Sequence, residues 1–354
     1  MNWKDRYPKQ SNLVKLALEQ GGAIKPLILP GEETGNNCSG GVGTGLRNPS
    51  VYIDEKEGIL VNIRHVGYTM YHTEFDQKYW GMWGCMIYMN PEDFMFLETT
   101  NYLCKLDEDL NISQYNKINT NKFDVEPLWD FIGLEDARVF RWDNKLYTCG
   151  VRRDLDDIGT GRMELCRIEY WKDGTLNETT RDRIEPPKEA YLEKNWTPIL
   201  DMPYHFVKWT NPTEIVKVDP HPYQGEIQKP LFAETVIQKN DHFPLDGCDL
   251  RGGSQVIPYK DYHICITHEC WFPEHDMGNG KDAHYHHRFI FWDKDWNIVK
   301  ISKKFKFMDT MIEFTCGLAE HGDNLLITFG YQDNGAYILK MPKNVLDLIE
   351  YEEL

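Results

Sequence analysis

Positive charge is in short supply in this chain of 354 residues. It has 39 Lys and Arg against 56 Asp and Glu, which gives a formal net charge of −17. A protein that binds a nucleic-acid backbone neutralises phosphates with Lys and Arg. The charge balance therefore argues against a nucleic-acid partner. A small anionic ligand stays compatible with it, because a few convergent basic residues in a pocket outweigh a distant net charge.

Long apolar runs are also missing. No segment approaches the roughly 18 consecutive apolar residues of a membrane span, and residues 1–20 carry charged side chains throughout, without the apolar stretch of a signal peptide. The nine cysteines are scattered, odd in number and never spaced as Cys-x-x-Cys: Cys38, Cys85, Cys104, Cys149, Cys166, Cys248, Cys265, Cys270 and Cys316. They predict reduced, buried thiols. We expect a cytoplasmic protein without a membrane span.

Helical periodicity is scarce. Only residues 11–20, with Ser11 as a cap, and residues 342–353 have a helical pattern. The glycine-rich residues 31–45 lack the strand, GxxxxGK[ST] and helix context of a phosphate-binding P-loop. Aromatic residues are plentiful, at 13% with 11 Trp and 19 Tyr. Such residues favour pleated surfaces, and Trp and Tyr also stack on sugar rings.

One pattern recurs five times along the chain: a β-rich run, a polar turn, and a second apolar run that ends in polar or charged residues. The five occurrences are residues 51–64, 138–153, 196–209, 254–269 and 314–333. Each has the signals of a β-hairpin. Five hairpins favour an all-β, five-bladed β-propeller with short N- and C-terminal helices, although a β-sandwich also uses many short strands. The predicted organisation is a helix and loop over 1–46, a single propeller domain over 47–341, and a helix over 342–354.

Charged and glycine residues precede these hairpins at one register. Glu135 and Asp136 stand before the second hairpin, Lys194 before the third and Arg251 before the fourth. In a propeller the inner strands deliver such residues to one axial mouth. Neighbouring residues of a strand point to opposite faces, so one of the two carboxylates is expected to enter the mouth. The structural alternative is an ion pair between Glu135 and Arg138, with Asp136 capping a turn.

The segment Gly133-Leu134-Glu135-Asp136-Ala137-Arg138 resembles the Glu-Asp-Pro-Arg signature of the β-mannoside phosphorylase and hydrolase family, and of the related β-mannosyltransferases. Further resemblances follow in the same order along the chain: Asn48-Pro49-Ser50 with Asn62-Ile63-Arg64, Glu193-Lys194-Asn195, and Phe329-Gly330-Tyr331-Gln332-Asp333. The resemblance implies a five-bladed propeller. It also implies that Asp136 is the proton donor and that Arg64 contacts phosphate.

The chain departs from that family at two places. Ala137 replaces the proline of the signature, and Lys208-Trp209 stands where the phosphorylases carry a His-Arg pair that helps to hold phosphate. The second departure favours transfer from an activated donor over phosphorolysis. Arg64, Lys194 and Lys208 are the predicted basic residues for the phosphate-bearing leaving group, with Arg251 and His268 as reserves.

Two motifs for metal binding are weaker. The run His284-Tyr285-His286-His287-Arg288, with His275 nearby, contains common metal ligands, but residues of a strand alternate faces and no Cys or carboxylate spacing completes a tetrahedral site. Asp154-Leu155-Asp156 matches the Asp-x-Asp motif of many nucleotide-sugar transferases, which are built from βαβ units that this chain lacks. We expect no metal and no obligatory cofactor.

The sequence thus predicts a glycosyltransferase-type enzyme that moves mannose or a similar hexose from an activated phosphate-containing donor to a carbohydrate acceptor. Asp136 is the predicted general acid/base, and phosphate or a nucleotide sugar is the co-substrate. The predicted substrate-binding residues are Arg64, Lys194, Asn195, Trp196, Lys208, Arg251, His268, Glu269, Glu313 and Asp333. Trp209 is an alternative to Trp196 for stacking on a sugar. A glycoside phosphorylase, a hydrolase and a non-catalytic glycan- or protein-binding propeller are the alternatives.

Overall fold

The computed structural model describes residues 11–29, 45–66, 69–70, 79–80, 87–89, 97–220, 230–245, 249–271, 284–310, 312–333 and 335–353. Within them, strands dominate and one α-helix is present. No described helix is both long and apolar enough to cross a bilayer. The six described cysteines, Cys104, Cys149, Cys166, Cys265, Cys270 and Cys316, are free and buried. Cys38, Cys85 and Cys248 lie outside the described residues.

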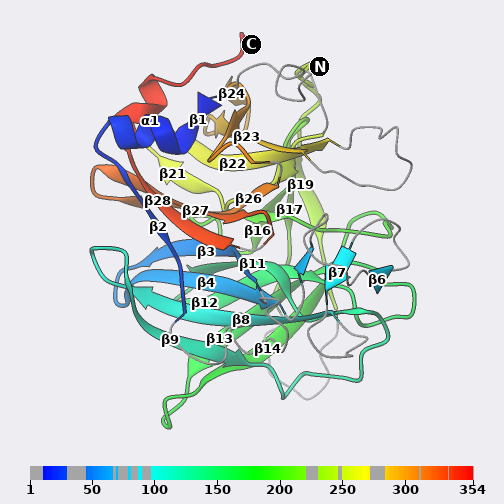
Figure 1. Cartoon of the computed structure of the whole chain (residues 1–354). Helices are drawn as coiled ribbons and strands as arrows, with labels where there is room; N and C mark the ends of the chain where they lie inside the picture. Colours follow the sequence, from blue (N-terminus) through cyan, green and yellow to red (C-terminus); the bar gives the residue numbers. More distant parts are fainter. Residues whose placement is uncertain are drawn as a thin grey trace.

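The strands form five antiparallel units in chain order, and each predicted hairpin is present at the start of one unit (Figure 1). The first unit contains β3 (Leu46–Asp54), β4 (Gly58–Val66), β8 (Leu97–Leu106) and β9 (Ile112–Asn119). The second contains β11 (Glu135–Trp142), β12 (Lys145–Arg152), β13 (Arg162–Tyr170) and β14 (Leu176–Glu185). The third contains β15 (Thr197–Pro198), β16 (His205–Trp209), β17 (Glu214–Lys217) and β19 (Glu234–Gln238).

The last two units recruit strands from the start of the chain. The fourth contains β20 (Arg251–Gly252), β21 (Ile257–Tyr259), β22 (Tyr262–Trp271), β23 (His284–Trp292), β24 (Ile298–Ile301) and β25 (Phe305–Lys306), to which β1 (Ser11–Asn12) adds in parallel. The fifth contains β26 (Glu313–His321), β27 (Asn324–Tyr331), β28 (Gly335–Pro342) and β2 (Ala23–Pro26). Sequence analysis missed β2, although it completes the fifth unit.

Five apolar clusters join the units in a cycle. Separate clusters lie between the first and second units, the second and third, the third and fourth, the fourth and fifth, and the fifth and first. The contact between Val51 and Val61 of the first unit and Leu326 and Ile338 of the fifth closes the cycle. Burial of this apolar surface is the main driving force for the arrangement. The ring therefore forms because every unit has two buried faces.

The remaining described elements are short. Strands β5 (Thr69–Met70), β6 (Tyr79–Trp80) and β7 (Ile87–Met89) form a small separate sheet, β10 (Phe131–Ile132) pairs with β8, and β18 (Leu231–Phe232) pairs with β14. Helix α1 (Leu13–Glu19) buries Leu13, Val14 and Ala17. Its cap is Asn12, which accepts the backbone N–H of Lys15 at 2.9 Å, and not Ser11 as predicted.

The predicted C-terminal helix is wrong in type and length. Only Lys343–Asp347 is helical, as a 3-10 turn. Beyond it Tyr351 forms a bridge with Ser302, and the backbone N–H of Glu352 donates to Ile301 at 2.8 Å. The end of the chain thus satisfies its backbone groups on the fourth unit, which a continued helix would prevent.

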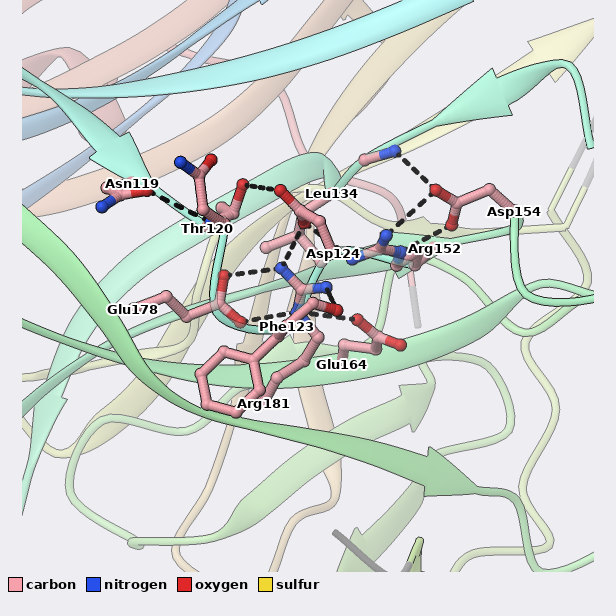
Figure 2. Close-up of polar contacts among 12 residues, drawn as sticks. Asn119, Thr120, Phe123, Asp124, Leu134, Arg152, Asp154, Glu164, Glu178 and Arg181 are labelled. Atoms are coloured by element: carbon pink, nitrogen blue, oxygen red, sulfur yellow. Dashed lines mark hydrogen bonds and ion pairs between the residues drawn. The ribbon is translucent and has the colours of Figure 1, made fainter. Parts of the chain in front are cut away.

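Of the five apolar clusters that join the units, the one between the first two units is the smallest, and a polar network lies beside it (Figure 2). Arg152 pairs with Asp154 at 2.5 Å, and Arg181 pairs with Glu178 at 2.6 Å. Glu164 is 1% exposed behind them. Burial raises the pKa of Glu164 to about 7, although Arg152 and Arg181 act against the rise.

The network makes stability depend on pH. The folded-state pKa of Glu164 exceeds its ordinary value of 4.5, so the fold binds this proton more tightly than the unfolded chain does. The stabilisation is complete below pH 4.5 and is lost as pH rises through 7. Between pH 5.5 and 8, the free energy of unfolding of the wild type is expected to fall by about 2 kcal/mol relative to that of Glu164→Gln.

Urea unfolding at several pH values measures this difference. Glu169→Gln, on the same strand but with a side chain 41% exposed, is the matched control and should run parallel to the wild type. A difference between wild type and Glu164→Gln that stays constant from pH 5.5 to 8 would contradict the prediction.

Candidate active site

Asp136 lies in a β-bulge at the start of β11. Glu135 pairs with Val151 and Arg138 with Cys149, so the register shifts between them. Asp136 has φ of +51°, a left-handed conformation that Asp tolerates better than most residues do. The bulge breaks the alternation of the strand. The two carboxylates therefore need not point to opposite faces.

Both carboxylates contact one guanidinium. Arg64 Nη1 donates to Asp136 Oδ1 at 2.9 Å, and its Nη2 lies 3.3 Å from Glu135 Oε2. Asn48 Nδ2 donates to the same Asp136 oxygen at 2.7 Å. Thr99 Oγ1 accepts from Arg64 and holds it in place. The expectation that Glu135 and Asp136 separate onto opposite faces is thus wrong.

The surroundings of Asp136 favour its charged form. Burial alone would raise its pKa, but Arg64, the Asn48 hydrogen bond, Arg138 and Lys194 together lower the pKa below its ordinary value. The side chain of Asp136 nevertheless keeps 15% of its surface exposed. It is therefore an ionised carboxylate, ready to accept a proton or a hydroxyl hydrogen bond.

Two glycines make room for this group. A Cβ on Gly150, across from the bulge, would lie 2.3 Å from the carbonyl oxygen of Glu135. A Cβ on Gly330 would lie 2.2 Å from Oδ1 of Asn48. Separations this short do not occur in folded proteins, so both positions admit only glycine while Asn48 and Glu135 stay in place.

Arg138 connects Asp136 to the third and fourth units. Its fully buried guanidinium donates to the carbonyl oxygen of Gly253 at 2.9 and 2.8 Å and to that of Asp136 at 2.7 Å. A longer bond of 3.4 Å reaches Oδ1 of Asn195. No hydrogen bond or ion pair between Arg138 and Glu135 is found among the described residues. Arg138 is therefore a structural clamp, which acts through main-chain carbonyl groups and not through the ion pair with Glu135 that the structural alternative proposed.

Three predicted basic residues gather in a pocket of about 340 Å³, called the basic pocket below. It is lined by Leu192, Glu193, Lys194, Lys208, Trp209, Arg251 and Gly252. Lys208 is held by Glu193 at 3.4 Å and Glu214 at 3.7 Å. Lys194 is exposed, and its charge contributes to the lowered pKa of Asp136. The pocket is therefore electrostatically coupled to the carboxylate.

Trp209 lies in the basic pocket with 40% of its surface exposed, whereas Trp196 is 1% exposed. Trp196 packs in the core between the second and third units and donates its indole N–H to Glu193 at 2.9 Å. Of the two candidates for stacking on a ring, the exposed Trp209 is thus the available one. Trp196 acts on the pocket only by positioning Glu193.

His268 lies behind the basic pocket. Its Nδ1 is 3.0 Å from the carbonyl oxygen of Gly252, and its ring stacks on Tyr285 with centroids 5.7 Å apart. Burial, and then His287, Lys194, Arg251 and Arg138, hold its pKa well below the ordinary value. His268 is therefore neutral and adds no positive charge for phosphate, contrary to its predicted role as a reserve cation.

Asp333 reaches the same region from the fifth unit. It pairs with Arg47 at 3.5 Å, one residue before Asn48, and keeps 17% of its side chain exposed. Asp333 and Asp136 both contribute to the raised pKa of Tyr285, after burial and Cys270. Asp136, Asp333 and Tyr285 thus surround one region of the ring.

Glu269 and Glu313 are buried and occupied by other partners. Glu269, 3% exposed, pairs with Arg288 at 2.5 Å and with Lys304 at 3.0 Å. Glu313, fully buried, accepts the backbone N–H groups of residues 307, 308 and 310. Together with Trp196, these residues present no surface for the direct ligand contacts that the sequence predicted.

Three residues in the surroundings of Asp136 are not predicted as site residues from the sequence: Asn48, Thr99 and Tyr285. In the sequence, Asn48 stands out only within the motif Asn48-Pro49-Ser50, Thr99 belongs to no motif, and Tyr285 lies within a histidine-rich run. An isolated Thr gives no signal in a sequence. The Asn-Pro pair and the aromatic residue among histidines could have drawn attention to the other two.

Metal binding has little support in the described part of the chain. It contains no group of three or more His, Cys, Asp or Glu side chains placed to hold an ion. Asp154 pairs with Arg152, and Asp156 accepts backbone N–H groups of Ile158 and Thr160 in its own turn. His275 lies outside the described residues.

Comparison with known proteins identifies the fold. No protein-family model matches the sequence, and no curated protein matches it. A protein of Bacteroides ovatus provisionally described as a glycoside hydrolase aligns with a TM-score of 0.53 and 10% identity, over 86% of this chain and 88% of that one. A protein of Parabacteroides distasonis with the same description aligns with a TM-score of 0.51 and 10% identity, also over 86% of this chain and 88% of that one.

A further structure carries a family name. It comes from work on the GH130 family of mannoside phosphorylases, described as containing glycoside hydrolases that target β-1,2 mannosidic linkages in Candida mannan. It aligns with a TM-score of 0.50 and 9% identity, over 90% of this chain and 97% of that one. These likenesses concern the fold, and they imply a five-bladed propeller. The cyclic order of the five units agrees with that arrangement.

The site geometry predicts how Asp136 titrates. Arg64→Met removes the opposite charge that lowers the pKa of Asp136 most, so this pKa should rise above its wild-type value. A pH titration of carboxyl-labelled aspartate by NMR, with Asp136→Asn to assign the signal, measures the change. Arg141→Met is the control: Arg141 also lies on β11, but it pairs with Asp54 of β3. This variant should leave the pKa of Asp136 unchanged. An unaltered titration of Asp136 in Arg64→Met would contradict the assignment.

Proposed function

We propose that this chain is a carbohydrate-active enzyme that breaks or forms a β-mannosidic bond, with Asp136 as its general acid/base. The observation that carries the proposal is the pairing of an ionised, partly exposed Asp136 with a basic pocket in one region of the ring. The likeness in fold to the GH130 structure supports the substrate class. Fold alone does not determine an activity, so the proposed activity depends on the side chains of the site.

In the direction of synthesis, the acceptor hydroxyl oxygen attacks the anomeric carbon of a mannosyl phosphate. The bond from that carbon to the phosphate oxygen breaks, and the phosphate leaves with the electron pair. Asp136 takes the proton of the attacking hydroxyl, and its lowered pKa supplies the ionised form that this step requires. In the reverse direction, phosphate attacks and the glycosidic oxygen receives the proton.

The basic pocket is the proposed phosphate subsite. Lys194, Lys208 and Arg251 provide positive charge that is already in place when charge develops on the leaving group. Lys208 is fixed by two carboxylates, which limits its motion but also offsets part of its charge. Lys194 and Arg251 are therefore expected to contribute most.

Transfer from a nucleotide sugar is the second candidate. The exposed Trp209 stands beside the cations, where an indole ring could stack on a nucleobase while the cations hold a diphosphate. Hydrolysis would need a second carboxylate to activate water. Asp333 is the predicted carboxylate that stays partly exposed in this region. The leaving group distinguishes these reactions.

Asp136→Asn tests the central assignment. It removes the proton acceptor without changing the size of the side chain, so kcat should fall by about 10²–10⁴-fold. Turnover is measured with mannose 1-phosphate, GDP-mannose and UDP-sugars against a panel of acceptors, and with β-mannobiose plus phosphate or water. Asp143→Asn, in the turn of the same hairpin, is the matched control and should retain full activity. Undiminished turnover in Asp136→Asn would overturn the role of Asp136.

The same turnover assay tests whether the basic pocket binds phosphate. Arg251→Met should raise the KM for phosphate or the phosphate-containing donor by about tenfold or more and leave binding of a neutral acceptor little changed. Lys217→Met, an exposed lysine of the third unit that pairs with Asp219, is the control. Equal KM values in wild type and Arg251→Met would move the phosphate subsite elsewhere.

A further inference from the structure

A second and larger cavity lies between the first and second units, and its lining includes neither Asp136 nor any residue of the basic pocket. Its volume is about 540 Å³, within the range of small-molecule pockets. Amides and hydroxyls are the largest group among its lining residues: Thr99, Thr100, Asn101, Asn116, Asn119, Thr120, Asn121, Thr148 and Thr175. The charged lining residues are Glu98, Asp124, Asp173, Glu178, Lys117, Arg152 and Arg181. It is called the inter-unit cavity below.

The fold holds this cavity open. Strand β11 contacts β3 and β4 near the centre of the ring, while β9 pairs in parallel with β14 through Ile118 with Leu176 and Asn119 with Asn177. The two sheets thus meet at both edges. The small apolar cluster fills only part of the space between them, and the polar cavity lies beside it.

The two arginines of the cavity do not form an anion site. Arg152 is bidentate to Asp154, with distances of 2.5 and 3.1 Å. Arg181 is bidentate to Glu178, at 2.6 and 2.9 Å, and also donates to Asp124 at 3.2 Å (Figure 2). Four carboxylates and three cations line the cavity, with Asp154 and Glu164 behind them. The excess of negative charge disfavours phosphate and other anions.

One buried acceptor is left without a donor on the cavity side of the second unit. Oε2 of Glu164 forms an ion pair with Arg181 Nε at 3.9 Å, which is too long for a hydrogen bond, and it has no hydrogen-bond donor among the described residues. The residue is 1% exposed. Cys166 is two residues along the same strand and stands opposite both Thr148 and Arg181, which line the cavity. Because side chains alternate in a strand, Glu164 shares their face. A buried acceptor without a hydrogen bond is costly, and a hydroxyl donor would supply one.

We propose that the inter-unit cavity binds a neutral sugar at a site separate from Asp136. Its amides and hydroxyls provide both donors and acceptors, as the hydroxyl groups of a sugar ring require. Ile118, Leu134 and Leu176 supply a limited apolar surface. This inference goes beyond the proposed function and does not depend on it, since the sugar would bind here whether or not Asp136 is catalytic.

The cavity also adjoins the Asp136 site. Thr99 lines the cavity and accepts hydrogen bonds from Arg64, which holds Asp136. Leu134 lines it one residue before Glu135. An occupied cavity therefore touches the wall of the candidate active site.

Calorimetric titration of the full chain tests the proposal. Mannose and β-mannobiose are the probes, and spermidine and inorganic phosphate represent the cationic and anionic alternatives. Sugar binding should persist in Asp136→Asn with its affinity changed less than threefold. Thr100→Trp, which fills the cavity from β8, should weaken that binding at least tenfold in the Asp136→Asn background. Val236→Trp, an exposed position on β19, is the matched control and should bind as the parent does.

A second variant guards against misfolding. Asn121→Trp narrows the exposed rim of the cavity and should also weaken sugar binding if Thr100→Trp proves unstable. Loss of all sugar binding in Asp136→Asn would overturn the separate site, as would unchanged binding in both tryptophan variants. Binding of spermidine or phosphate without sugar would overturn the ligand class. Absence of turnover in the wild type would instead count against the proposed function alone.

Discussion

The buried guanidinium of Arg138 is the contact on which the candidate site depends. It donates to main-chain oxygens of Asp136 and Gly253 and to the side chain of Asn195, and so ties the second unit to the third and fourth. Each partner adjoins a residue with a proposed role: Asp136 itself, Lys194 beside Asn195, and Arg251 two residues before Gly253. Because a buried arginine must satisfy its donors, these three segments are held at fixed positions. The carboxylate and the cations are thereby kept in one region.

The chemistry of Asp136 follows from a local departure from regular strand geometry. A strand without the bulge would direct Glu135 and Asp136 to opposite faces. The bulge instead lets both meet Arg64, and the additional Asn48 contact keeps Asp136 ionised. Irregular backbone at functional sites is common because it re-aims side chains. The space for this irregularity comes from Gly150 and Gly330, which lie on two other strands.

The sequence predicts the five hairpins because each is a local pattern of apolar runs and turn residues. It also predicts Asp136 as the general acid/base, and Arg64, Lys194, Lys208 and Arg251 as substrate-binding residues. It does not reveal β2 or the C-terminal end, because both depend on edges supplied by distant strands. The burial of individual side chains could not be predicted from the sequence either. No local pattern distinguishes the buried Trp196 from the exposed Trp209, or shows that Glu313 accepts hydrogen bonds from backbone N–H groups. Those assignments depend on neighbours that only the fold brings together.

The ring also explains why a polar cavity can persist beside one interface. Four of the interfaces between units are filled by large apolar clusters, which hold the cycle together. The first and second units are connected additionally by the parallel pairing of β9 with β14, so that interface is closed by backbone hydrogen bonds at its outer edge. Less apolar packing is then needed there. Arg152, Glu164 and Arg181 can occupy the space because the neighbouring interfaces stabilise the ring without them.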